Sequence, residues 1–132
     1  MHPTEILFQK ACEVRKNAYA PYSQFFVGAC IEAEDGSLFV GCNVENAAYR
    51  ATTCAETNAI SAMVSAGKIK IKQIMLVVKG PAVSAPCGIC RQSLNEFALA
   101  NTLVHLATEH EIKATHRLEV LLPHSFGSKD LL

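Results

Sequence analysis

The sequence predicts an α/β fold in which helices cover a central sheet. Three observations carry this prediction. Apolar residues recur at helical spacing near the amino terminus, two apolar runs then flank a turn, and helical and strand-like segments alternate through the rest of the 132 residues. Half of the residues are hydrophobic, which is enough for a substantial core. We find no internal repeat or linker, so we expect residues 1–132 to form one domain.

The first part of the chain predicts a helix followed by a hairpin. Apolar residues at helical spacing indicate a helix over residues 4–19, with Thr4 as its cap. Residues 25–33 and 37–42 are apolar runs on either side of the turn sequence at 34–36, a pattern typical of two antiparallel strands.

The remainder predicts alternating helices and strands, followed by a tail. The expected elements are, in order, helices at 53–66 and 87–100 with a strand at 73–79 between them, strands at 102–107 and 112–117, and a short turn or helix at 119–122. The strand at 73–79 is apolar throughout its centre, which is typical of a strand buried on both faces.

Composition and charge exclude several classes of function. Lys+Arg and Asp+Glu are both 12, so the chain lacks the positive excess that binding to a nucleic-acid polymer requires. No apolar run is long enough to cross a bilayer, and the first residues do not resemble a secretory signal, so we expect a cytoplasmic protein with no membrane partner. In that reducing compartment the six cysteines should be thiols or metal ligands.

Three cysteines and one glutamate form the clearest chemical signal. Cys54 precedes Glu56 by two residues, and Cys87 and Cys90 follow in P-C-x-x-C spacing. Three thiolates leave the fourth position of a tetrahedral zinc ion open for water, whereas a structural site closes with four protein ligands. Glu56 is too close to Cys54 to bind the same ion, but it can overhang the open position and carry protons. This spacing is the signature of zinc-dependent deaminases.

The predicted ligands also lie where helices are expected to begin. Cys87 and Cys90 are i,i+3 neighbours and share one helix face, so both can reach a common ion. Helix amino termini carry partial positive charge, which favours the thiolates that a metal requires.

The cysteines also allow two other interpretations, a redox motif and a structural zinc site. A C-x-x-C pair alone also occurs in redox motifs and zinc ribbons, but a redox motif leaves Cys54 and Glu56 without a role. A ribbon needs a fourth ligand, for which Cys42 is the nearest candidate. The remaining thiols, Cys12, Cys30 and Cys42, are expected to be buried small side chains. The histidines of the last strands are expected at the surface or at a sheet edge: His105, His110 and His116.

Motifs outside the cysteine pattern extend the signal over nearly the whole chain. They are A-P-Y-S-Q-F at 20–25, G-C-N-V-E-N-A-A-Y at 41–49 and L-L-P-H-S-F-G at 121–127, beside C-A-E and P-C-G-I-C-R-Q. With these motifs the chain resembles the small cytidine deaminases of pyrimidine salvage. The resemblance implies a three-layer α/β/α sandwich with a mixed five-stranded sheet. It also implies a hydrolase that converts cytidine and deoxycytidine to uridine and deoxyuridine with release of ammonia.

The resemblance implies roles for individual residues as well. One zinc ion per subunit would be bound by the three cysteines, and Glu56 would move protons from the attacking water to ring N3 and then to the leaving amine. The nucleoside would contact seven residues: Phe25 on the pyrimidine face, Asn43 and Glu45 at the ribose hydroxyls, and Ala47, Tyr49, Ala55 and Phe126.

The resemblance further implies a homotetramer whose active sites are completed by neighbouring subunits. Ala47, Tyr49 and Phe126 would then serve an adjacent site. In the alternative, Phe126 tucks against its own core, and Asn43 and Glu45 are ordinary loop residues.

One position departs from the pattern of many family members. Thr57 stands where they place an arginine that hydrogen-bonds the zinc thiolates. Two other arginines could take over its role and balance the negative charge of the thiolates without binding the metal: Arg91, directly after Cys90, and Arg50.

Related functions fit less well. A free nucleobase, or an antibiotic of the blasticidin type, would present no ribose for Glu45, and a deoxycytidylate would need a phosphate cradle that the sequence lacks. Editing of nucleic acid is disfavoured by the neutral charge. A zinc-stabilised binding module without activity would leave Glu56 unused.

Overall fold

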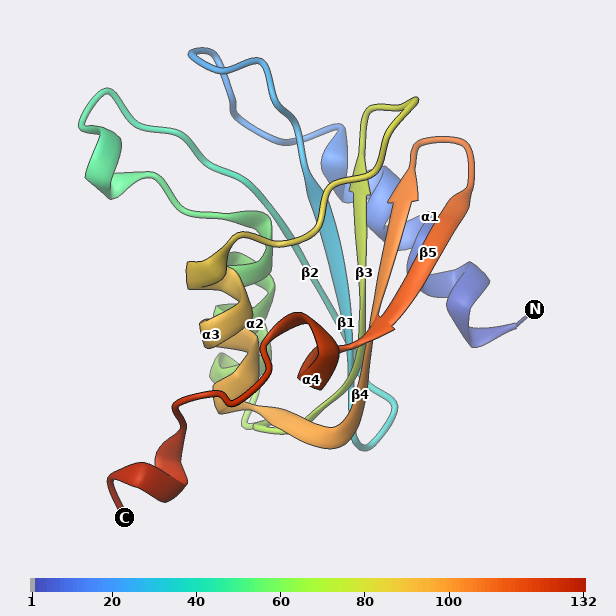
Figure 1. Cartoon of the computed structure of the whole chain (residues 1–132). Helices are drawn as coiled ribbons and strands as arrows, with labels where there is room; N and C mark the ends of the chain where they lie inside the picture. Colours follow the sequence, from blue (N-terminus) through green and yellow to red (C-terminus); the bar gives the residue numbers. More distant parts are fainter. Residues whose placement is uncertain (1) are drawn as a thin grey trace.

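The architecture is a three-layer α/β/α sandwich (Figure 1). The computed structural model describes residues 2–132. Its elements are, in order, α1 (Pro3–Arg15), β1 (Gly28–Ala33), β2 (Leu38–Cys42), the 3-10 turn η1 (Tyr49–Ala51), α2 (Ala55–Ser65), β3 (Ile71–Val78), α3 (Gly88–Glu96), β4 (Ala98–Thr108), β5 (Ile112–Arg117), α4 (Leu118–Leu121) and the 3-10 turn η2 (Ser128–Asp130).

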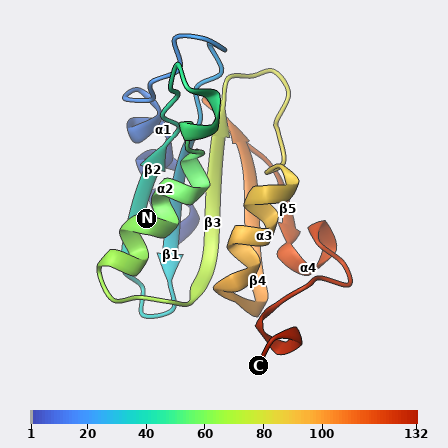
Figure 2. The ribbon, with the colours of Figure 1, turned by 90° about the vertical axis from the view of Figure 1, so that its left-hand side faces the viewer.

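The five strands form one mixed sheet in the order β2-β1-β3-β4-β5. Only β3 and β4 run parallel, and the other neighbouring pairs are antiparallel. α2 and α3 lie side by side on one face, whereas α1 lies behind the other (Figure 2). The predicted fold class is confirmed.

Alternation along the strands divides the core between the two faces. Ala29 and Ile31 of β1 join the cluster under α2 and α3, while Cys30 between them joins the cluster under α1. β3 is buried along nearly its whole length, as predicted for a strand covered on both faces. No helix within residues 2–132 is long and apolar enough to cross a membrane.

The first helix begins and ends earlier than the sequence indicated. His2, not Thr4, is the cap: its side chain accepts a hydrogen bond from the Thr4 N–H, and a proline fills the first helical position. The helix ends at Arg15, and by Tyr19 the backbone is extended and pairs with Val44 in an isolated parallel bridge.

The prediction of a helix through residue 100 was wrong. α3 ends at Glu96, and residues 98–100 already belong to β4, where Ala98 pairs with Ile71 of the neighbouring strand. Pairing with β3 therefore outweighs the local helix propensity of this alanine- and leucine-rich stretch.

Two glycines allow the helices on both faces to pack directly on the first hairpin. An added Cβ at Gly41 would lie 2.4 Å from the backbone nitrogen of Ala59 in α2. At Gly28 it would lie 2.1 Å from the carbonyl oxygen of Ala11 in α1. The hairpin thus fixes the height of both helices above the sheet.

Candidate functional site

The three cysteines of the predicted zinc site line one pocket. Cys54 is the N-cap of α2, Cys87 is the N-cap of α3, and Cys90 lies in the first turn of α3. α2 and α3 are in contact, and their amino termini place the three thiols around one pocket from positions far apart in the sequence. The pocket has a volume of about 220 Å³. Its lining is Phe25, Val27, Asn43, Thr52, Thr53, Cys54, Ala55, Glu56, Leu76, Val78, Ser84, Ala85, Pro86, Cys87 and Cys90.

The cysteine side chains are free thiols, and the pKa values of Cys54 and Cys90 depend on the charge of the neighbouring cysteines. Burial raises the pKa of both Cys54 and Cys90, which outweighs the opposite effect that their helix positions predicted. Within residues 2–132 no three or more His, Cys, Asp or Glu side chains lie close enough together to hold a metal ion as they stand. Three thiols around a pocket at two helix starts nevertheless suit a soft cation, which displaces thiol protons as it binds.

Glu56 lies in the first turn of α2 and faces the same pocket. Only 7% of its surface is exposed. Burial raises the pKa of its carboxyl group, and the Cys90 thiol beside it partly offsets that effect. A buried carboxyl group with a raised pKa is suited to accept and release a proton.

Asn43 and Phe25 also line the pocket. The Asn43 side chain donates a hydrogen bond to the Phe25 carbonyl over 2.7 Å and accepts one from the Val27 N–H over 2.9 Å. Asn43 is therefore buried and holds the backbone on both sides of residue 26 in place. A ring at Phe25 is thereby kept at the pocket edge, where it can pack against a flat ligand.

Glu45 lies outside the pocket lining, two residues after Asn43 in the segment that Val44 pairs with Tyr19 and Thr53. Its Oε1 accepts hydrogen bonds from the N–H groups of Tyr22 and Ser23, and its Oε2 accepts one from the Ser23 hydroxyl. The Ser23 hydroxyl is the main cause that holds the pKa of this carboxyl group below its usual value. Glu45 is thus a fixed, ionised acceptor.

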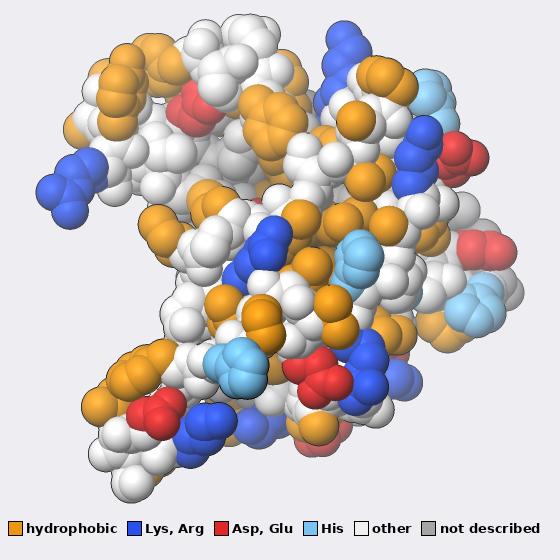
Figure 3. Space-filling model, viewed as in Figure 1, with side chains coloured by type: hydrophobic (Ala, Val, Ile, Leu, Met, Phe, Trp, Pro, Cys, Tyr) orange, Lys and Arg blue, Asp and Glu red, His pale blue; other side chains and the backbone are white. Residues whose placement is uncertain are grey.

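The remaining predicted substrate contacts divide between the pocket and the surface. Ala55 lines the pocket, whereas Ala47, Tyr49 and Phe126 are exposed. Tyr49 is 77% exposed and Phe126 is 58% exposed. Figure 3 shows hydrophobic side chains gathered at the top and bottom of the concave left edge of the molecule, over the loops and the C-terminal tail respectively. The chain therefore does not bury Phe126 itself.

Arg91 supports the thiol pocket through the backbone. Its guanidinium donates to the Pro86 carbonyl over 2.6 Å and to the Leu121 carbonyl over 2.8 Å. The residue thus ties the loop before Cys87 to the end of α4. Arg50 is exposed on η1, outside the pocket lining.

Several lining residues were not predicted from the sequence. Thr52, Thr53 and the segment 84–86 complete the pocket, and Ser23 holds Glu45. Ser23 lies inside the A-P-Y-S-Q-F motif, so the motif contained the signal, but its partner is 22 residues away.

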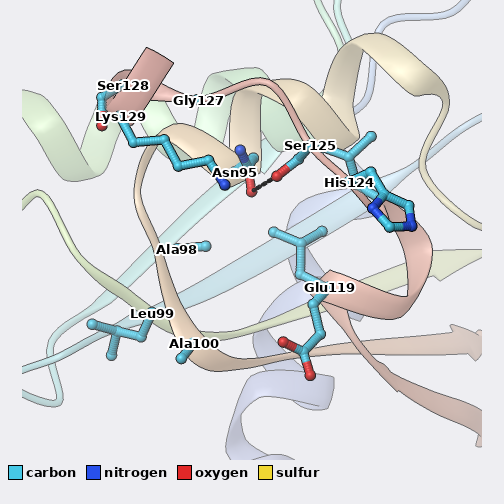
Figure 4. A pocket seen from close by; sticks show the side chains of 12 residues that line it. Asn95, Ala98, Leu99, Ala100, Glu119, His124, Ser125, Gly127, Ser128 and Lys129 are labelled. Atoms are coloured by element: carbon cyan, nitrogen blue, oxygen red, sulfur yellow. Dashed lines mark hydrogen bonds between the residues drawn. The ribbon is translucent and has the colours of Figure 1, made fainter. Parts of the chain in front are cut away.

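A larger hollow of about 520 Å³ lies between α3, the start of β4 and the C-terminal tail (Figure 4). Its lining includes His124, Lys129, Glu119 and a hydrogen-bonded pair in which the Ser125 hydroxyl donates to Asn95. These groups carry no arrangement of nucleophile, acid and base, so the smaller thiol pocket is the candidate active site.

The fold and the pocket define a class: an α/β sandwich with three thiols and a buried carboxyl group around one pocket. Comparison with known proteins agrees. The family model of the cytidine and deoxycytidylate deaminase zinc-binding region matches residues 1–106. A cytidine deaminase of Sporosarcina psychrophila is 40% identical over 128 residues, which cover 96% of this chain and 93% of the relative.

Solved structures give the same result. A cytidine deaminase from Burkholderia pseudomallei matches with a TM-score of 0.85 at 37% identity, covering 92% of this chain and 98% of that one. The cytidine deaminase from Mycobacterium tuberculosis matches with a TM-score of 0.83 at 35% identity, covering 96% and 99%. The chain belongs to the cytidine and deoxycytidylate deaminase zinc-binding family.

Proposed function

We propose that this chain catalyses the hydrolytic deamination of cytidine and deoxycytidine, giving uridine or deoxyuridine and ammonia. The observation that carries the proposal is the pocket itself, in which three thiols, a buried carboxyl group and an aromatic ring face one small volume. The pocket accepts a flat heterocycle edge-on to the thiols. Family membership supplies the reaction class.

Cys54, Cys87 and Cys90 would hold one Zn²⁺ per subunit. Zinc with three protein ligands supplies Lewis acidity and an acidic water at its open position. The three side chains start from two rigid helix ends, which fixes their spacing. Arg91 keeps the backbone before Cys87 in place.

Glu56 would manage the protons of the reaction. In its ionised form the carboxylate takes a proton from the attacking water and delivers it to ring N3 as the new bond to C4 forms. The proton of the new hydroxyl on C4 then passes through Glu56 to the amino group; the C4 carbonyl forms, the C4–N bond breaks and the amino group leaves as ammonia. Because burial raises its pKa, the carboxyl group can hold the proton between these transfers.

Phe25, Asn43 and Glu45 would orient the nucleoside. Phe25 packs on the pyrimidine face, and the amide and carboxylate of the 43–45 segment face the sugar. Neutral charge and a small, partly apolar pocket suit a nucleoside better than a nucleic-acid polymer.

Activity is tested by following the ultraviolet change of cytidine with wild-type protein, Glu56→Gln and the exposed-site control Glu13→Gln, all at equal zinc content. We expect turnover by wild type and the control, and a loss of at least about 10²-fold in kcat for Glu56→Gln. Equal rates for Glu56→Gln and wild type would contradict the proton-carrier role. No turnover by the wild type would contradict the enzyme.

The ligand set is tested by metal analysis. Cys87→Ala should lose zinc together with activity, because two thiolates and a water hold zinc far less tightly than three. Cys42→Ala is the matched control, since this thiol lies on β2 outside the pocket. A full zinc equivalent in Cys87→Ala, or loss of zinc from Cys42→Ala, would mean that the ligands are wrongly assigned.

We also propose that residues 1–132 fold as one domain that assembles into a homotetramer with shared active sites, acting in pyrimidine salvage in the cytoplasm. Exposed Tyr49 and Phe126 support the assembly, because each would be buried at a neighbour's site. Free thiols at the pocket suit a reducing compartment. Light scattering of wild type and Phe126→Ala tests the assembly: a wild-type monomer with full activity would contradict it.

A further inference from the structure

We propose that Ser23 is a positioning residue that sets the one free acceptor site of Glu45 for a ribose hydroxyl of the substrate. The proposal rests on the proposed nucleoside deamination and deepens it, because it assigns sugar recognition to a residue that does not line the pocket.

Donors of the same chain occupy most of the hydrogen-bond acceptor sites of the Glu45 carboxylate. A carboxylate offers about four lone-pair sites. Two are taken on Oε1 by the N–H groups of Tyr22, at 3.0 Å, and Ser23, at 3.1 Å. The Ser23 hydroxyl takes one on Oε2. One acceptor site therefore remains, on Oε2, and it suits a single hydroxyl donor.

The 43–45 segment directs that free site toward the pocket side. Val44 forms a bridge with Thr53 on one side and with Tyr19 on the other, so the segment is extended. Side chains two residues apart on extended backbone point the same way, about 7 Å apart. Since Asn43 faces the pocket, Glu45 faces the same side one step further from the thiols. The sugar of a nucleoside would lie on this side if its base faced the thiols.

Ser23 links this carboxylate to the aromatic wall. Its hydroxyl oxygen accepts a hydrogen bond from the Phe25 N–H over 3.0 Å while its proton goes to Glu45. Gln24 between them has a φ of +59°, a left-handed conformation that neighbouring bonds must hold in place. Without the Ser23 hydroxyl, Oε2 loses its fixed direction, and the terminal torsion of Glu45 has only shallow preferences of its own.

The experiment compares two substrates in each variant. The measured quantity is the ratio of kcat/KM for cytidine to kcat/KM for 2′,3′-dideoxycytidine, which lacks the 2′- and 3′-hydroxyls of the sugar and keeps the 5′-hydroxyl. Any general disturbance of Phe25 affects both substrates and cancels in the ratio. We expect Ser23→Ala to lower this ratio by roughly tenfold, mainly through KM for cytidine, because a hydrogen bond to a charged group is lost. Ser23→Thr should restore the ratio.

The matched control is Ser37→Ala. Ser37 also donates its hydroxyl to a carboxylate, that of Asp35, over 2.5 Å, but in the β1–β2 turn at the opposite end of the sheet (Figure 1). Its ratio should stay at the wild-type value. A double variant, Ser23→Ala with Glu45→Gln, should lose little more than Glu45→Gln alone, because the serine acts through the glutamate.

The outcomes separate the two proposals. An unchanged ratio in Ser23→Ala, or losses that add in the double variant, would overturn the positioning role while wild-type turnover of cytidine stands. No turnover of cytidine by the wild type would instead overturn the proposed function.

Discussion

Replacing Gly41 by alanine tests whether catalysis depends on the close seat of α2 on the sheet. The new Cβ would lie 2.4 Å from the Ala59 nitrogen and 2.5 Å from the Ala55 carbonyl oxygen. Ordinary contact begins near 3.4 Å, so α2 must move outward by about 1 Å. Overpacking of this kind costs about 1–3 kcal/mol of stability.

The same movement carries Cys54 and Glu56 away from Cys87 and Cys90, because only the former pair belongs to the start of α2. A displacement of about 1 Å between reacting groups can cost 10²-fold in rate. We therefore expect kcat for cytidine, measured per bound zinc, to fall by roughly 10²-fold in Gly41→Ala. Calorimetry should show a melting temperature lower by several degrees.

Gly28→Ala is the control that separates the effect of moving α2 from the effect of a less stable protein. Its Cβ would lie 2.1 Å from the Ala11 carbonyl oxygen, so it pushes on α1, which carries none of the predicted site residues. We expect at least as large a loss of stability, with kcat per bound zinc preserved within about threefold. Full kcat per zinc in Gly41→Ala, or equal losses of kcat in both variants, would refute the reasoning.

Two further predictions concern buried polar contacts. Burial holds the pKa of His105 below its ordinary value. Below about pH 6.5 the His105 imidazole is therefore protonated in the unfolded chain to a greater extent than in the folded chain. The free energy of unfolding, measured with urea, should fall from pH 7 toward pH 5.5 by at most about 1.4 kcal/mol per pH unit. This dependence on pH should be weaker in His105→Gln and unchanged in the exposed-site control His116→Gln. Equal slopes in the two variants would contradict the role of His105. Arg91→Lys cannot span both the Pro86 and Leu121 carbonyls, so zinc affinity in a chelator competition should drop about tenfold. Affinity equal to wild type would contradict that supporting role.

Local patterns were sufficient to predict most elements and the places of the three thiols. Helix caps, turn residues and apolar runs act over a few neighbours, and they predicted the starts of α2 and α3 to within two residues of the observed Ala55 and Gly88. The strand at 112–117 was predicted with its observed bounds.

The errors arise where distant partners decide. His105 was expected at the surface or an edge, but only 5% of it is exposed, because Gln73 of β3 and Thr115 of β5 bind its two ring nitrogens. Gln73 in turn donates to Glu32 of β1, which completes a polar chain across four strands. A single sequence does not reveal such partners, and the same holds for the contact between Ser23 and Glu45.

The two helix starts have a consequence for the order of folding. Cys54 precedes α2, while Cys87 and Cys90 begin α3, so α2, all of β3 and the loop after it lie between them. The thiols can meet only after this long loop has closed and both helices have docked on the sheet. A complete zinc site is therefore a late event, and the rate of zinc capture during refolding should report the arrival of the native sheet.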